Sequence, residues 1–185
     1  DIGLKVGHSF RTIDECVKLS KEDVTIRTSI LDKRFLFGDR GVYDKLAERF
    51  QKDVIAGRGA EFVAAKLQER ADRHAREGDS RYRVEPNVKD GKGGLRDLQT
   101  LFWLAKYIHG GKTLQQVLDN SAFTPADEAI FLRAARFLWT VRCHLHFLTG
   151  RAEERLSFDL QPEMATRMGY TARQNVNAVE RFMKR

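Results

Sequence analysis

The chain has 185 residues, of which 42% are apolar and 32% charged, and its formal net charge is +7. This balance is that of a folded globular protein and excludes a disordered one. No apolar stretch approaches the roughly 18 residues of a transmembrane helix, and no signal peptide opens the chain, so we expect a cytoplasmic protein without a membrane partner.

The predicted elements begin with a short strand over residues 3–10, which runs into a turn. Thr12 and Glu15 then have the spacing of a capping box, which predicts the start of a helix. Hydrophobic periodicity and the positions of Gly and Pro predict further helices over residues 23–37, 42–55, 61–76, 95–109, 113–118, 124–149, 161–168 and 171–185. The expected fold class is therefore mainly α, a multi-helix domain with a short residual strand at the N-terminus.

The positive charge is spread along the whole chain. Lys and Arg are interleaved with Asp and Glu, which favours solvated helix faces over a nucleic-acid-binding stripe. Trp103 and Trp139 fall on apolar stripes, so we expect both in the core rather than stacked on bases. No nucleic acid partner is expected. The alternative, a basic nucleic-acid-binding domain, predicts an affinity that falls steeply with salt.

Two other groups have ordinary structural interpretations. Cys16 and Cys143 are not spaced as a metal pair and are typical of buried or half-buried free thiols. His144 and His146 are two residues apart on a predicted helix and so point to different faces, which disfavours a shared metal. We expect a hydrogen-bonded His, or an Arg–Glu network made by Arg142, Arg151, Glu153, Glu154 and Arg155.

Residues 80–94, SRYRVEPNVKDGKGG, contain one Pro and three Gly and have no helical period, so they predict a loop before a helix. Glycines allow a ligand to approach the backbone, and the free N–H groups of a helix N-terminus attract anions. The pattern is not that of a P-loop. The candidate contacts for a phosphate or a protein partner are Lys89, Lys92, Gly93, Gly94 and Arg96. The alternative is a structural turn, in which Asp90 and Asp97 pair with basic side chains or cap the helix.

Four separated segments carry a resemblance to a known family. They read LKVGHSFRTIDEC, VEPNVKDGKGGLRDLQTLFWLAKY, FLWTVRCHLHFLTGRAEERLSFDLQ and AVERFMKR. In this order, they make the chain resemble the bacterial bifunctional PII uridylyltransferases over essentially its whole length. A related KxGxGGxRDxE segment occurs in glutamine synthetase adenylyltransferases, but Gln99 stands at its last position. That family is therefore the lesser alternative.

The resemblance implies an enzyme with a nucleotidyltransferase domain, a helical region, an HD-type phosphohydrolase domain and two ACT domains. It implies Mg²⁺-dependent transfer of UMP from UTP to a tyrosine of the PII signalling protein, and removal of UMP when glutamine is high. Residues 1–22 would be the C-terminal edge of the nucleotidyltransferase domain. Residues 23–185 would be the helical domain, which we expect to be truncated at its C-terminus.

Both signatures of the family's active sites are missing from the sequence. There is no Gly-Ser followed by Asp-x-Asp, and no His is followed by Asp. Since two-metal chemistry needs clustered carboxylates, we expect this segment to contain no catalytic residue and no metal and to be inactive alone. It would support the nucleotide cleft. The alternative is a helical interaction module that binds PII or braces neighbouring domains.

Overall fold

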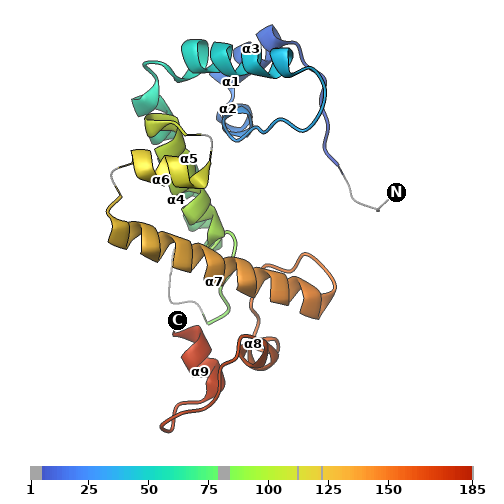
Figure 1. The fold of residues 1–185 in the computed structure, drawn as a ribbon. Helices are drawn as coiled ribbons and strands as arrows, with labels where there is room; N and C mark the ends of the chain where they lie inside the picture. The colour runs from blue at the N-terminus through green and yellow to red at the C-terminus, as the bar shows by residue number, and fades with distance from the viewer. Residues whose placement is uncertain (1–5, 79–83, 112, 122, 185) are drawn as a thin grey trace.

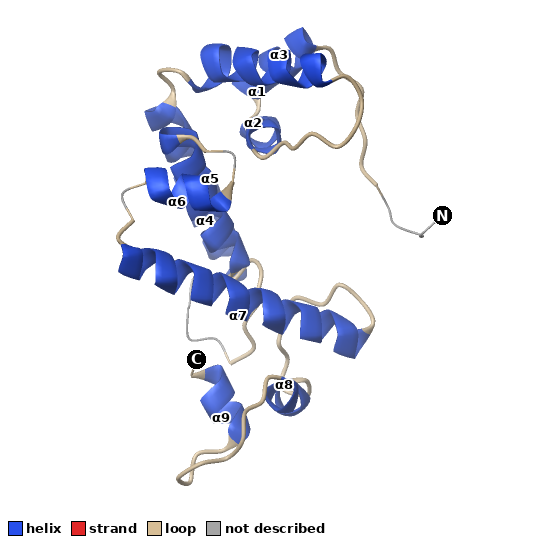
Figure 2. Ribbon diagram, in the orientation of Figure 1, coloured by secondary structure: helices blue, strands red, loops and turns tan. Residues whose placement is uncertain are grey.

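The computed structural model describes residues 6–78, 84–111, 113–121 and 123–184. Over these ranges the chain forms helices joined by loops and no strand, which confirms the mainly α class (Figure 2). The helices are α1 (Ile13–Glu22), α2 (Val24–Leu31), α3 (Arg40–Phe50) with a π-helical turn (Gln51–Ile55), α4 (Gly59–Glu77), α5 (Leu95–His109), α6 (Leu114–Asn120), α7 (Pro125–Thr149), α8 (Gln161–Arg167) and α9 (Ala178–Met183).

Side-chain caps fix the predicted helix starts. The Thr12 hydroxyl accepts a hydrogen bond from the Glu15 N–H at 3.2 Å, and the Glu15 carboxylate accepts one from the Thr12 N–H at 2.7 Å. Thr124 and Asp127 form the same reciprocal pair at the start of α7. Each cap satisfies N–H groups that the helix leaves without partners. The predicted starts at Thr12 and Thr124 are thus confirmed, as are the bounds of α5.

Three predicted elements are wrong or only partly seen. Residues 6–10 of the predicted strand are irregular and exposed, and its first residues lie outside the described ranges. The helix expected over 23–37 ends at Leu31, because Leu36 and Phe37 find no core and stay exposed. The last helix begins at Ala178, since residues 173–176 form a tight turn closed by a β-bridge.

Two hydrophobic clusters lie at opposite ends of the molecule (Figure 1). The first is shared by α1–α5 and contains Val17, Leu31, Phe50, Val54, Phe62 and Tyr107. The second gathers α7, α8, α9 and the loop before α5, and contains Val88, Val141, Leu145, Leu156, Met164, Ala165 and Phe182. Helix α7 crosses the end of the α4–α5 pair (Figure 1). The loop before α5 lies where α7 crosses this pair, and its Val88 belongs to the second cluster.

A buried arginine joins three helices in the first cluster. Arg27 of α2 is 1% exposed and donates to the carbonyls of Ser20 and Lys21, at 2.7 and 2.9 Å, which end α1. Its third nitrogen lies 2.9 Å from the Glu61 carboxylate of α4. These contacts satisfy carbonyls that α1 leaves without partners and fix α2 against α4, which forms one wall of the groove described below.

Two side chains expected inside are exposed. Trp139 is 44% exposed and its ring lies 5.2 Å from the Arg142 guanidinium, so its core prediction is wrong. Cys143, one turn further along α7, is exposed, whereas Cys16 is buried as expected. Both residues lie on the side of α7 that is turned away from the second cluster.

Candidate functional site

The loop before α5 is held by main-chain pairing with a distant segment. The Val88 N–H donates to the Glu154 carbonyl at 2.8 Å, and the Leu156 N–H donates to the Pro86 carbonyl at 2.9 Å. The Asn87 side chain accepts from two further N–H groups of the loop, at 3.0 and 2.8 Å. This turn chemistry is typical of Asn. The loop is therefore a folded structure with a defined shape.

The two glycines among the candidates are required for different reasons. Gly93 has φ +81°, in the left-handed region that favours glycine. Gly94 has ordinary backbone angles, but a Cβ there would lie 2.9 Å from three backbone oxygens. The Gly94 N–H donates to Gly91 O at 2.9 Å, and the Gly93 N–H donates to the Asp97 carboxylate at 2.8 Å. Both N–H groups are thus already bonded inside the protein, and side chains are what the loop presents to a ligand.

Asp97 connects the loop to α4. Its carboxylate also accepts from Arg73 and lies 3.0 Å from His74 Nε2, and both of these α4 side chains are buried. Arg70 adds an ion pair at 3.4 Å. Burial raises the pKa of Asp97, but the Gly93 N–H, His74 and Arg70 together hold that pKa below its ordinary value. The charged carboxylate therefore stabilises the α4–α5 pair.

A second carboxylate, Glu154, fixes the other side of the loop. Arg142 of α7 binds it through Nε and Nη2, at 2.9 and 2.7 Å. His146 Nε2 and Lys89 Nζ lie 3.6 and 3.9 Å from it. Burial raises the pKa of Glu154, but Arg142, Lys89 and His146 together hold that pKa below its ordinary value. Together with the 2.7 Å pair between Arg151 and Glu153, this confirms the predicted Arg–Glu network except for Arg155, which joins it only through its backbone N–H, a donor to Glu153 at 3.0 Å.

The five candidate residues lie on different sides of the loop. Lys89 is turned toward Glu154 and α7, while Lys92 and Gly93 line a groove of about 490 Å³ beside Leu67 and Leu101. Arg96 lines another groove, of about 450 Å³, between α2, α4 and α5. Gly94 is buried in the loop. The structure thus separates residues that are neighbours in sequence.

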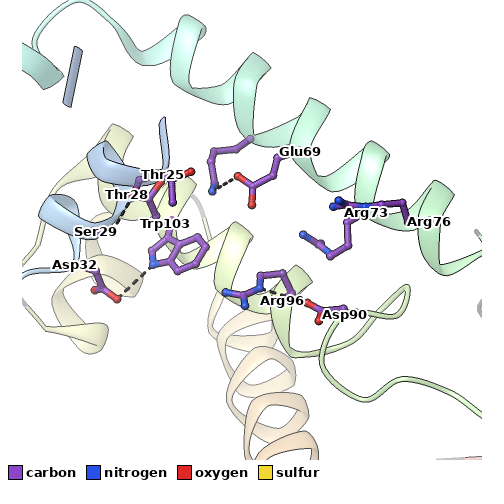
Figure 3. A pocket seen from close by; sticks show the side chains of 11 residues that line it. Thr25, Thr28, Ser29, Asp32, Glu69, Arg73, Arg76, Asp90, Arg96 and Trp103 are labelled. Carbon is purple, nitrogen blue, oxygen red and sulfur yellow. Dashed lines mark hydrogen bonds and ion pairs between the residues drawn. The ribbon is translucent and has the colours of Figure 1, made fainter. Parts of the chain in front are cut away.

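The groove beside Arg96 has polar walls (Figure 3). Helix α2 contributes hydroxyl groups and its C-cap residue Asp32 follows them, α4 contributes a row of charged side chains, and Trp103 of α5 lies between them. The α4 row consists of Lys66, Glu69, Arg73 and Arg76. Our sequence reasoning missed this row. Its only signal is a spacing of three or four residues, which an ordinary solvated helix face shares.

The described ranges contain neither a metal-binding cluster nor a membrane-spanning helix. In them, no group of three or more His, Cys, Asp or Glu side chains is placed to hold a metal ion. None of the helices in the described part of the chain is both long and apolar enough to cross a membrane.

Comparison with known proteins shows what the chain is similar to. It is 64% identical over 185 residues to the bifunctional uridylyltransferase/uridylyl-removing enzyme of Phenylobacterium zucineum. It is 58% identical over 184 residues to the enzyme of that name in Rhodopseudomonas palustris, and 53% identical over 184 residues to that in Azospirillum brasilense. Each match covers all of this chain and 20% of the relative, so the chain spans about a fifth of their length. No solved structure matches it.

The family model described as GlnD PII-uridylyltransferase matches residues 61–185, a range that contains all of α4 but its first two residues, the loop, α5 and everything after them. Both grooves include residues from this range. The chain therefore belongs to the GlnD PII-uridylyltransferase family.

Proposed function

We propose that the chain is a helical segment of an enzyme that transfers UMP from UTP to a tyrosine of the PII signalling protein. A separate domain of that enzyme would remove UMP hydrolytically, and glutamine would control the two activities in the cytoplasm. The observation that carries the proposal is the match of the whole chain to longer relatives that are named for both activities. Mg²⁺ would serve the transfer, held by residues outside this segment.

In this proposal the segment supports the nucleotide cleft and contributes no catalytic group. Phosphoryl transfer depends on positioning and on positive charge around the phosphates, both of which a rigid basic loop supplies. Lys89, Lys92 and Arg96 would provide that charge from different sides of the loop, with Arg96 on the α4 side, while Gly93 and Gly94 would give the loop its shape. The fixed backbone of the loop supports this division of roles.

Replacing both Lys89 and Lys92 by alanine in the full-length enzyme should raise the KM for UTP. Loss of one charge-assisted contact to a phosphate corresponds to about a tenfold change. Steady-state uridylylation at varied UTP concentration measures the effect, and Lys45→Ala, an exposed lysine of α3, is the matched control. Kinetics equal to those of the unmodified enzyme would remove both lysines from the site.

A helical interaction module, which binds PII or braces neighbouring domains, is favoured by one observation. Leu67 and Leu101 are 48% and 41% exposed and line the groove beside Lys92. Exposed apolar patches mark surfaces that other proteins cover. Capture of PII by the full-length enzyme without UTP, lost on Leu101→Asp but not on Gln68→Asp, would support the module. Equal capture by both variants would exclude this groove as the PII-binding surface.

A further inference from the structure

The groove between α2, α4 and α5 gathers more basic groups than its structural pairs use. Lys66 is 2% exposed and is paired with Glu69 at 2.6 Å, with its Nζ 4.7 Å from the centre of the Trp103 ring. Asp32 is paired with Lys106 at 2.9 Å. These groups are satisfied within the protein and form the walls of the groove.

Three arginines in the same groove are less well satisfied. Arg73 is 6% exposed and its Nε is buried without a hydrogen-bond partner among the described residues, although its Nη2 reaches Asp97. The Arg76 side chain is exposed and makes no hydrogen bond or ion pair with any described residue. Arg96 donates from Nη1 to the Gln99 side-chain oxygen at 3.0 Å, but its Nε lies 3.6 Å from the Asp90 carboxylate, longer than a hydrogen bond. A buried donor without a partner costs free energy, and like charges that line one cavity repel each other.

We infer that this groove binds a phosphate group through Arg73, Arg76 and Arg96, and that the phosphates of a nucleotide are its source. Guanidinium groups bind phosphate through paired N–H donors, and a bound anion relieves the repulsion among them. The groove, of about 450 Å³, is large enough for more than one phosphate. Figure 3 shows Arg73 and Arg76 coming from α4 and Arg96 from α5 toward the same space.

The inference rests on the proposed function, which supplies the nucleotide, and it adds the place where the phosphates bind. The phosphates lie on the α4 side of the loop, and the contacts include α4 residues that no loop motif contains. The Arg76→Ala variant distinguishes loss of the phosphate contact from general damage to the loop. Arg76 belongs to α4, and its side chain has no pairing partner among the described residues that the change would remove.

The test uses the full-length enzyme with Arg76→Ala and Arg96→Ala. Each variant should raise the KM for UTP about tenfold, weaken inhibition by pyrophosphate, and leave the uridylyl-removing rate unchanged, since that reaction uses no UTP. Glu69→Gln removes a negative charge from the groove and should lower the KM severalfold, a gain that a folding defect does not produce. Arg136→Ala, an exposed arginine of α7 that lines none of the grooves described, is the matched control.

The outcomes separate the two proposals. A wild-type enzyme that transfers no UMP would refute the proposed function itself. Weaker pyrophosphate inhibition in the variants with an unchanged KM for UTP would keep the phosphate site but make the free anion its ligand. An active enzyme whose KM and pyrophosphate inhibition are unchanged by Arg76→Ala and Arg96→Ala would overturn the inference.

Discussion

Replacing Asp97 by alanine is expected to lower the free energy of unfolding by about 3–5 kcal/mol. The change leaves Arg73 and His74 buried without their carboxylate and removes the acceptor of the Gly93 N–H. The measurement is urea unfolding followed by far-UV circular dichroism. Asp72→Ala is the control, because Asp72 is an exposed α4 residue whose side chain, among the described residues, accepts only from Gln68, and the change should cost at most about 0.5 kcal/mol.

At acid pH, the difference in unfolding free energy between the wild type and Asp97→Ala should disappear. The pKa of Asp97 is lower in the folded protein than its ordinary value of about 3.9, so its contribution is present above that value. The contribution is lost as the pH falls below about 4 and through the pKa of Asp97 in the folded protein, because the Asp97 carboxylate of the wild type then becomes protonated. The gap in unfolding free energy between wild type and Asp97→Ala should narrow in this range. A gap of the same size at pH 3 and pH 6 would show that packing, not charge, is the cause.

Two neighbouring glycines should respond differently to substitution. Gly94→Ala places a Cβ 2.9 Å from three backbone oxygens, which cannot move without breaking the loop, and should cost about 1–3 kcal/mol or more. Gly93→Asn should cost much less, because asparagine tolerates the left-handed conformation and no atom lies within 4 Å of the added Cβ. The measurement is again urea unfolding.

The order of these two effects decides the interpretation. Gly94→Asn should behave like Gly94→Ala, because steric overlap and not backbone conformation limits that position. If Gly93→Asn lowered the free energy of unfolding more than Gly94→Ala does, steric overlap of a Cβ added at position 94 would not be the constraint that shapes the loop.

Local signals in the sequence were sufficient for the bounds of α5 and α7. Thr124, Pro125 and Gly150 bound α7, and Gly94 and Gly110 flank α5. The helix predicted over residues 23–37 was too long, because apolar residues continue after Leu31 where no core covers them. Prediction also failed before α9, where Gln174 and Asn175 take left-handed angles. Asn177, with Glu180 three residues later, was the capping signal that gives the true start of α9.

The candidate site was predictable in its chemistry but not in its arrangement. The glycine and lysine pattern indicates a shaped basic loop before α5, and the structure has one. Which side each residue faces depends on partners far along the chain, such as Arg73 for Asp97 and Arg142 for Glu154. Such long-range pairs leave no periodic trace in a single sequence, so the α4 arginines of the groove were missed.

The pairing of residues 86–88 with residues 154–156 has a consequence for the order of folding. Helices α5, α6 and α7 make local contacts and can form early, whereas this pairing closes a loop of more than sixty residues and must overcome its entropy. During synthesis, the segment after α7 leaves the ribosome well after the glycines do. The loop therefore acquires its final shape only after residues 154–156 have been made and have folded back onto it.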